Sequence, residues 1–175
     1  MAGAKDWSLR LARIADAEAM PAIEARAGQM FDEVDGLAGI AGQPTLPLDR
    51  LRGYIRKGHC LVAHEEGTII GFIVTEPFGR ELHVWGFDVD PDHQRRGIGA
   101  GLLRAAMIDA RNSGFRAITL TTFRDVPWNA PFYARLGFEE VTALDAHPRL
   151  AGELAVEADL GLPAERRCAM IRFLD

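Results

Sequence analysis

The chain has 175 residues, 48% hydrophobic and 26% charged, which is typical of one compact globular domain and unlike a disordered or fibrous protein. The formal net charge of -5, with no long basic run, argues against binding to a phosphate backbone, so we expect no nucleic-acid partner. The first ten residues hold no signal-peptide core, and no apolar stretch approaches the ~20 residues of a membrane span. We therefore expect a cytoplasmic protein with no membrane partner.

The first third of the chain predicts one strand and two helices. Residues 8–14 alternate polar and apolar side chains, as a strand does. Asp16 is expected to cap an alanine-rich helix that runs to about Phe31, with Pro21 near its start. Residues 47–57 predict a second helix, which Gly58 would end.

The rest of the chain alternates strands and helices. A strand, a helix and a strand between residues 82 and 122 imply a parallel, right-handed crossover beside antiparallel neighbours. We therefore expect a single α/β domain over residues 1–175, built on one mixed sheet of about seven strands with helices on both faces. The expected strands are 60–64, 69–75, 82–89, 117–122, 138–141 and 169–174, and the expected helices are 99–112, 130–136 and 148–160.

Few residues suggest metal or thiol chemistry. Cys60 and Cys168 lie far apart and outside any CxxC spacing, so we interpret them as reduced thiols of the core. The histidines at positions 59, 64, 93 and 147 have no metal-ligand spacing. We predict no metal.

The turn after residue 89 carries the strongest chemical signal. Asp90 and Pro91 end a strand, and Gly97 and Gly99 precede a long helix. Backbone N–H groups at such a glycine turn, with the positive end of the helix, form a cradle for an anion such as a pyrophosphate. A plain tight turn is the alternative. A dinucleotide-binding turn would need a third glycine where Leu102 stands, and the Gly-Lys-Ser/Thr of a P-loop is absent.

The segment Gln94-Arg95-Arg96-Gly97-Ile98-Gly99-Ala100 resembles the Gln/Arg-x-x-Gly-x-Gly/Ala signature of the GNAT superfamily of acyl-CoA N-acyltransferases. The segment from Asn129 to Phe138, with Tyr133, resembles the Asn-x-x-x-Tyr-x-x-x-Gly-Phe pattern of the same family. The resemblance covers residues 60–141 well and the first sixty residues loosely. It implies acceptor-side helices at about 16–57, an acyl-CoA-binding core at about 60–141 and a C-terminal return at 142–175.

The resemblance also implies acetyl-CoA as cosubstrate. Backbone groups of Phe87 and Val89 would pair with the pantetheine arm, the amides of residues 96–100 would hold the pyrophosphate, and Asn129 and Phe132 would line the channel. Successive side chains of a strand point to opposite faces, so the Asp88 side chain, which follows Phe87, is expected to face away from the cofactor. The expected cofactor-binding residues are Phe87, Asp88, Val89, Gln94, Arg95, Arg96, Gly97, Ile98, Gly99, Ala100, Asn129 and Phe132.

Tyr133 is the expected general acid. A phenol with a pKa of ~10 is protonated at neutral pH and can protonate a leaving thiolate, whose parent thiol has a pKa of ~8.5. The alternative is a tyrosine that packs under the short helix. The Val89 N–H is a candidate oxyanion donor.

The general base is predicted from its distance in sequence to the motif glutamine, Gln94. Some histone-type members of the family carry a glutamate eleven positions before the motif glutamine, and His83 stands there in this chain. A neutral imidazole with a pKa of ~6.5 suits proton abstraction at physiological pH. Glu76, Glu81 and a water molecule are the alternatives.

The resulting hypothesis is an N-acetyltransferase in which a primary amine of a small molecule directly attacks acetyl-CoA in a ternary complex. Two alternatives stay open: an enzyme for a peptide or protein N-terminus or lysine, and a non-catalytic acyl-CoA-binding sensor. The partner is thus an amine or peptide acceptor, and a homodimer is left open.

We expect helix 148–160 to flank the acceptor cleft. Four acidic residues of the front helices are candidates to attract an ammonium group, although a solvated face explains them equally well: Glu24, Asp32, Glu33 and Asp35.

Overall fold

The computed structural model describes residues 6–40 and 46–175. This part of the chain forms one seven-stranded sheet in the order β1-β2-β3-β4-β5-β7-β6, in which only β4 and β5 run parallel. The expected fold class is therefore confirmed. The strands are β1 (Ser8–Leu11), β2 (Leu61–Glu65), β3 (Thr68–Phe78), β4 (Glu81–Val89), β5 (Ala117–Phe123), β6 (Glu139–Glu140) and β7 (Arg167–Phe173). The helices are α1 (Met20–Gly28), α2 (Leu48–Arg56), α3 (Ile98–Asn112), α4 (Ala130–Arg135) and α5 (Pro148–Asp159).

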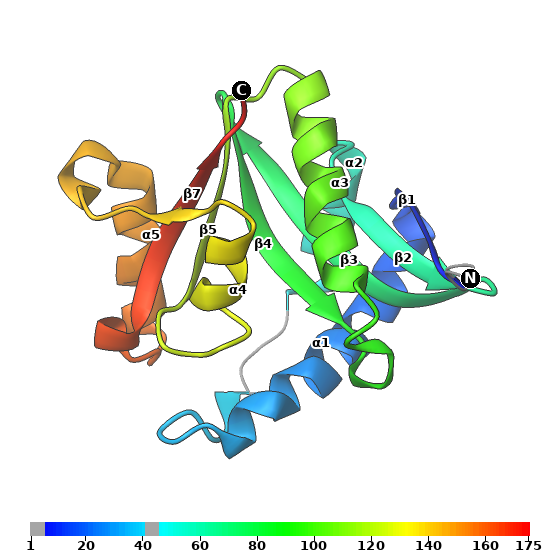
Figure 1. Cartoon of the computed structure of the whole chain (residues 1–175), viewed down its shortest axis with the longest axis horizontal. Coiled ribbons are helices and arrows are strands. Elements are labelled where there is room, and N and C mark those ends of the chain that lie inside the picture. The colour runs from blue at the N-terminus through cyan, green and yellow to red at the C-terminus, as the bar shows by residue number, and fades with distance from the viewer. Residues whose placement is uncertain (1–5, 41–45) are drawn as a thin grey trace.

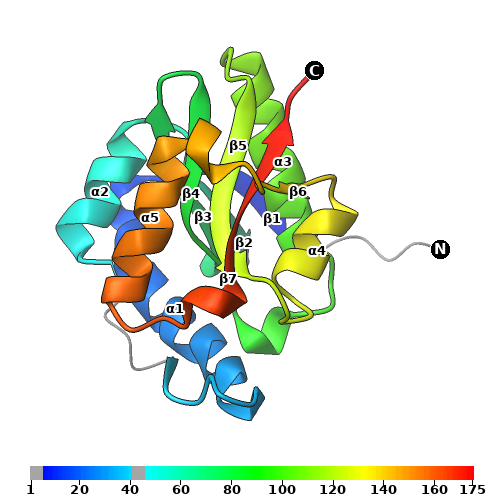
Figure 2. The same ribbon diagram turned by 90° about the vertical axis from the view of Figure 1, so that its left-hand side faces the viewer.

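Helices cover both faces of the sheet. Helices α3 and α4 lie on one face and α1, α2 and α5 on the other, as the two views in Figures 1 and 2 show. The crossover from β4 to β5 passes through α3 and is the only parallel connection among the described residues. It explains why the sheet is mixed, since every other neighbouring pair is antiparallel.

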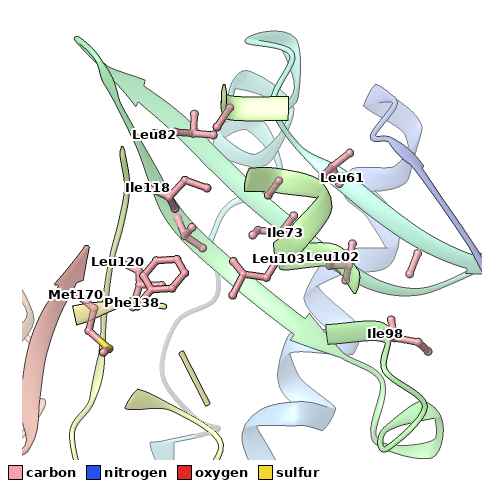
Figure 3. Close-up of a cluster of buried hydrophobic side chains, with 14 of the residues drawn as sticks. Leu61, Ile73, Leu82, Ile98, Leu102, Leu103, Ile118, Leu120, Phe138 and Met170 are labelled. Atoms are coloured by element: carbon pink, nitrogen blue, oxygen red, sulfur yellow. The ribbon is translucent and has the colours of Figure 1, made fainter. Parts of the chain in front are cut away.

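Two apolar clusters hold these layers together. Buried positions of α3 recur at helical spacing, from Ile98 through Leu102 and Ala106 to Ala110, and pack on Leu82 and Ile118 of the sheet (Figure 3). On the opposite face, Met20 and Ile23 of α1 and Leu51, Tyr54 and Ile55 of α2 pack on Phe72 and Val74 of β3. The removal of this apolar surface from water is the main force that fixes both helix layers.

The start of the first helix differs from the prediction. Asp16 does not cap an α-helix, because residues 14–19 form a 3-10 helix and α1 begins only at Met20. The Asp16 carboxylate instead accepts the N–H of Arg13 at 2.7 Å and forms an ion pair with Arg10 at 2.6 Å. Pro21 then falls in the first turn of α1, where its missing N–H costs no intrahelical hydrogen bond.

Strand β3 also extends further than predicted. It passes through Pro77 to Phe78, where the sequence suggested a break. The pairing of β2 with β3 ends at Ile73, so Pro77 lies where β3 is an edge on that side and needs no N–H for the ladder.

No helix in the described part of the chain is long and apolar enough to cross a bilayer. A cytoplasmic location stays a prediction from the sequence, as does the division of the chain into acceptor, cofactor and return segments.

Candidate active site

A cavity of about 850 Å³ opens where β4 and β5 separate. The two strands pair only over Glu81–His83 and Ala117–Thr119, so the second half of β4 has no partner on that side. Residues of β4, β5, α1 and α4 and the turn before α3 line the space. This separation opens the cavity beside the unpaired half of β4.

A β-bulge in β4 decides which side chains reach each face of the sheet. Val74 of β3 pairs with Gly86 and Thr75 pairs with Val84, which leaves Trp85 without a partner. The extra residue changes the alternation, so Leu82 and Val84 before the bulge, and Phe87 and Val89 after it, all pack on the α3 side. Asp88 therefore points to the opposite face, which α1 covers, and it lines the cavity from there.

The free edge of β4 presents backbone groups to the cavity. The N–H of Asp90 donates to Ile70 of β3 at 2.8 Å, and successive residues of a strand direct their backbone groups to opposite edges. Phe87 and Val89 therefore direct their N–H and C=O groups away from β3, into the gap. The Gln94 side chain donates to the Val89 carbonyl at 3.3 Å, and the Val89 N–H stays available to a ligand.

The turn between β4 and α3 exposes the N-terminus of the helix to the same cavity. Gly97 caps α3 with a φ of 79°, a left-handed conformation that glycine adopts without strain. The first intrahelical bond runs from the N–H of Gly101 to Gly97, so the N–H groups of Ile98, Gly99 and Ala100 have no helical acceptor. All three residues line the cavity, which makes this end a suitable anion cradle.

The two arginines of the turn behave differently. Arg95, with a φ of 63°, lines the cavity, whereas the Arg96 side chain forms an ion pair with Glu65 at 2.6 Å and lies outside it. His93 lines the cavity as well and contacts the same Glu65 at 3.2 Å. Of these two expected cofactor-binding residues, the structure thus brings Arg95 to the cavity and leaves Arg96 beside it.

Asn129 and Phe132 lie on the wall formed by α4 and β5. The Asn129 carbonyl oxygen accepts from Thr122 Oγ1 at 2.9 Å and from the N–H of Phe123 at 3.3 Å, which fixes the start of α4 to β5. The Phe132 ring stacks on Phe87 across the gap, with centroids 6.2 Å apart. Gly99 is packed under this wall, since a Cβ there would lie 3.6 Å from Phe87 and 3.8 Å from Phe132.

Tyr133 lines the cavity and is half-buried among aromatic rings. Its ring is 6.1 Å from that of Phe87 and 5.6 Å from that of Phe138. Burial raises the pKa of the Tyr133 hydroxyl, and the nearby Asp88 carboxylate raises it further. The phenol is therefore protonated over the whole working pH range and can act as a donor.

His83 does not reach the cavity. Its side chain is 1% exposed, on the face of the sheet covered by α5. Its Nδ1 lies 2.8 Å from Thr119 Oγ1 and 3.1 Å from an Arg149 nitrogen. Burial, with the nearby Arg149 and His147, lowers the pKa of His83 to about 3. Such an imidazole is neutral but only weakly basic, so its environment argues against the role of general base.

The structure also locates helix α5 and the acidic residues of the front helices, which the sequence analysis assigned to the acceptor side. Helix α5 forms as expected and lies next to His83 through Arg149, but none of its residues lines the cavity. Of the four acidic residues considered in the front helices, Glu24 lines the cavity and the other three do not. Met30, Phe31 and Trp128 complete this end of the wall. Nothing in the sequence distinguished Glu24 from its neighbours, since the distinction comes from the orientation of α1.

No group of three or more His, Cys, Asp or Glu side chains in the described ranges is arranged to hold a metal ion.

Comparisons with known proteins agree with this geometry. The model of the acetyltransferase (GNAT) family matches residues 29–138. The chain is 33% identical over 102 residues to the S-(2-succino)cysteine N-acetyltransferase of Bacillus subtilis, a match that covers 52% of this chain and 61% of that protein. The match therefore spans less than two thirds of the length of this curated relative.

Solved structures show the same fold at low identity. The PaiA N-acetyltransferase of Thermoplasma acidophilum, in complex with coenzyme A, superposes with a TM-score of 0.68 at 16% identity, over 95% of this chain and 98% of that one. The N-acetylglutamate synthase of Neisseria gonorrhoeae, complexed with coenzyme A and N-acetyl-glutamate, gives a TM-score of 0.71 at 17% identity, over 97% of this chain and 35% of that one.

Proposed function

Because the chain belongs to the acetyltransferase (GNAT) family, we propose that it transfers the acetyl group of acetyl-CoA to a primary amine of a small molecule. The observation that carries this proposal is the cavity between β4 and β5. It combines a helix N-terminus for an anion, a free strand edge and a protonated tyrosine in one space of about 850 Å³.

The residues present suit each part of acetyl-CoA. The amides of residues 98–100 and the Arg95 guanidinium would hold the pyrophosphate. The backbone of Phe87 and Val89 would pair with the amide groups of the pantetheine arm as an added strand does. Phe132 and Asn129 would close the opposite wall.

The same residues supply most of the chemistry. An amine and a thioester held side by side react as if in one molecule, which can contribute several kcal/mol, up to about 7–11. The Val89 N–H would donate to the oxygen that becomes negative when the amine attacks. Tyr133 would give its hydroxyl proton to the departing sulfur, so that the free thiol of CoA leaves instead of a thiolate.

Direct attack on the thioester is supported by the placement of the thiols. Cys60 and Cys168 are each 2% exposed, and neither lines the cavity. Burial raises the pKa of Cys60 to about 11, so this thiol is not an available nucleophile. An acyl-enzyme on cysteine is therefore disfavoured, and a ternary complex is the simpler route.

A small acceptor is supported by the cavity and by the relatives. Helix α1 and Trp128 border the acceptor end, and the Bacillus subtilis relative is named for a small amino-acid derivative. Release of free CoA thiol from acetyl-CoA tests the proposal, with a panel of primary amines and a matched panel of short peptides. We expect release with amines, with intersecting lines in initial-rate plots. Release with peptides alone would favour the protein acceptor, and CoA binding without any acceptor-dependent release would favour a sensor.

A further inference from the structure

Two carboxylates in the cavity are left without partners. Asp88 of β4 and Glu24 of α1 both line it, and within the described residues neither accepts a hydrogen bond nor lies within ion-pair distance of a cation. The other carboxylates of β4 and of the turn that follows it are paired. Asp90 accepts from Arg26 and from the N–H of Asp92, and Glu81 accepts from Arg149 and His147. An unpaired carboxylate in a half-buried cavity costs stability, which indicates that a ligand completes the site.

The bulge and the orientation of α1 bring the two groups together. Because Trp85 is the extra residue of β4, Asp88 points toward α1, where Glu24 faces the sheet. Burial raises the pKa of Asp88 well above its usual range, and the charge of Glu24 raises it further. Burial raises the pKa of Glu24 as well. The other titratable groups that line the cavity are Tyr133 and Arg135 of α4 and His93 and Arg95 of the turn.

We propose that Asp88 is the general base of the reaction and that Glu24 is the second carboxylate that draws the acceptor into the cavity as its ammonium ion. This inference rests on the proposed acetyl transfer and names the chemistry of its acceptor, an amine that is cationic at neutral pH. Two adjacent carboxylates are complementary to one ammonium group. The ammonium supplies the positive charge and the N–H donors that the protein does not.

The proton balance of the reaction is complete with these groups. An ammonium ion must lose two protons to become an amide. Asp88 takes the first, which frees the nitrogen lone pair for attack on the thioester carbon. When the C–S bond breaks, Tyr133 protonates the sulfur and recovers a proton from the attached nitrogen. Asp88 then releases its proton to water, so the net products are the amide, the free thiol and one proton.

The other candidate bases are engaged elsewhere. His83 lies outside the cavity with its Nδ1 between Thr119 and Arg149. Glu76 pairs with Lys57 and accepts from the Trp85 indole at 3.3 Å, and Glu81 pairs with Arg149 at 2.6 Å. Each of these carboxylates would have to give up a cation before it could accept a proton from the substrate.

The test compares D88N, E24Q, H83Q and the control E18Q on an amine that the wild-type protein acetylates. Glu18 is an exposed carboxylate near α1 that does not line the cavity. We expect D88N to lower kcat by ~10²–10⁴-fold and to abolish the acidic limb of the pH–rate profile, with CoA affinity unchanged in calorimetry. E24Q should raise KM for the amine more than it lowers kcat, and should move the acidic limb to lower pH because the charge that raises the Asp88 pKa is gone. H83Q and E18Q should keep the wild-type limb.

Three results would overturn the inference, and they can be told apart. A D88N protein that binds CoA and keeps wild-type kcat and an unchanged acidic limb removes Asp88 from the chemistry while acetyl transfer stands. Absence of thiol release from the wild-type protein with every cationic amine overturns the proposed function and the inference together. Loss of the acidic limb in H83Q, with D88N unchanged, would return the base to His83.

Discussion

Replacement of Asp88 by asparagine should stabilise the protein while it removes activity. The side chain is half-buried, without a hydrogen-bond donor or cation among the described residues, so its charged form loses hydration and gains nothing in return. The desolvation penalty of one unsatisfied polar group is about 1–3 kcal/mol and is larger for a charge. We therefore expect D88N to raise the free energy of unfolding at neutral pH by about 1–3 kcal/mol, which corresponds to roughly 2–4 °C in Tm for each kcal/mol.

The increase in the free energy of unfolding that D88N gives over the wild type should depend on pH in a defined direction. Burial and Glu24 raise the pKa of Asp88 in the folded state above the ~3.9 of an unfolded chain. Between these two pKa values the folded state binds more protons than the unfolded state, so wild-type stability falls as pH rises through this window. Below it Asp88 is neutral in both states and the gain from D88N should vanish. The gain should grow as pH rises and level off above the raised pKa.

Urea unfolding at several pH values measures this difference, with E18Q as the control. Glu18 is an exposed carboxylate, with a side chain 72% exposed, and its replacement should change stability by less than about 0.5 kcal/mol at any pH. A D88N protein that is less stable than the wild type at neutral pH, or whose gain does not depend on pH, would show that the Asp88 carboxylate has a partner in the folded state. The argument that the Asp88 carboxylate is unpaired in the folded protein would then be refuted.

Four further substitutions test the rest of the cavity. Y133F keeps the ring contacts and removes the hydroxyl proton, so kcat should fall ~10²–10⁴-fold with CoA affinity nearly unchanged, and full activity would remove the case for an acid there. G99E places a carboxylate beside Phe87 and Phe132 at the N-terminus of α3, so a folded variant should lose CoA affinity in calorimetry, and undiminished affinity would contradict the anion cradle. R95A should weaken CoA binding more than R96A does, because Arg96 is paired with Glu65 and Arg95 faces the cavity, and equal losses would contradict this assignment.

The sequence predicted the fold and the turn before α3 because their signals are local. The glycines at 97 and 99, the proline at 91 and the helical spacing of α3 each constrain the backbone within a few residues, and the structure shows a turn and a helix there. Elements whose limits depend on tertiary contacts were predicted less well. Asp16 pairs with Arg10 instead of capping an α-helix, and Pro77 is tolerated because β2 does not extend beside it on that edge of β3.

The acceptor side could not be predicted because it depends on one extra residue in β4. Counting positions back from Gln94 placed His83 at the base, which assumes that the facing of side chains is set by sequence distance alone. The bulge at Trp85 breaks that assumption, since residues before and after it alternate in different phase. His83 consequently lies against α5, while Asp88 faces α1 and lines the same cavity as Tyr133. A one-residue insertion in the pairing, invisible to a motif, thus decides which titratable group can reach the substrate amine.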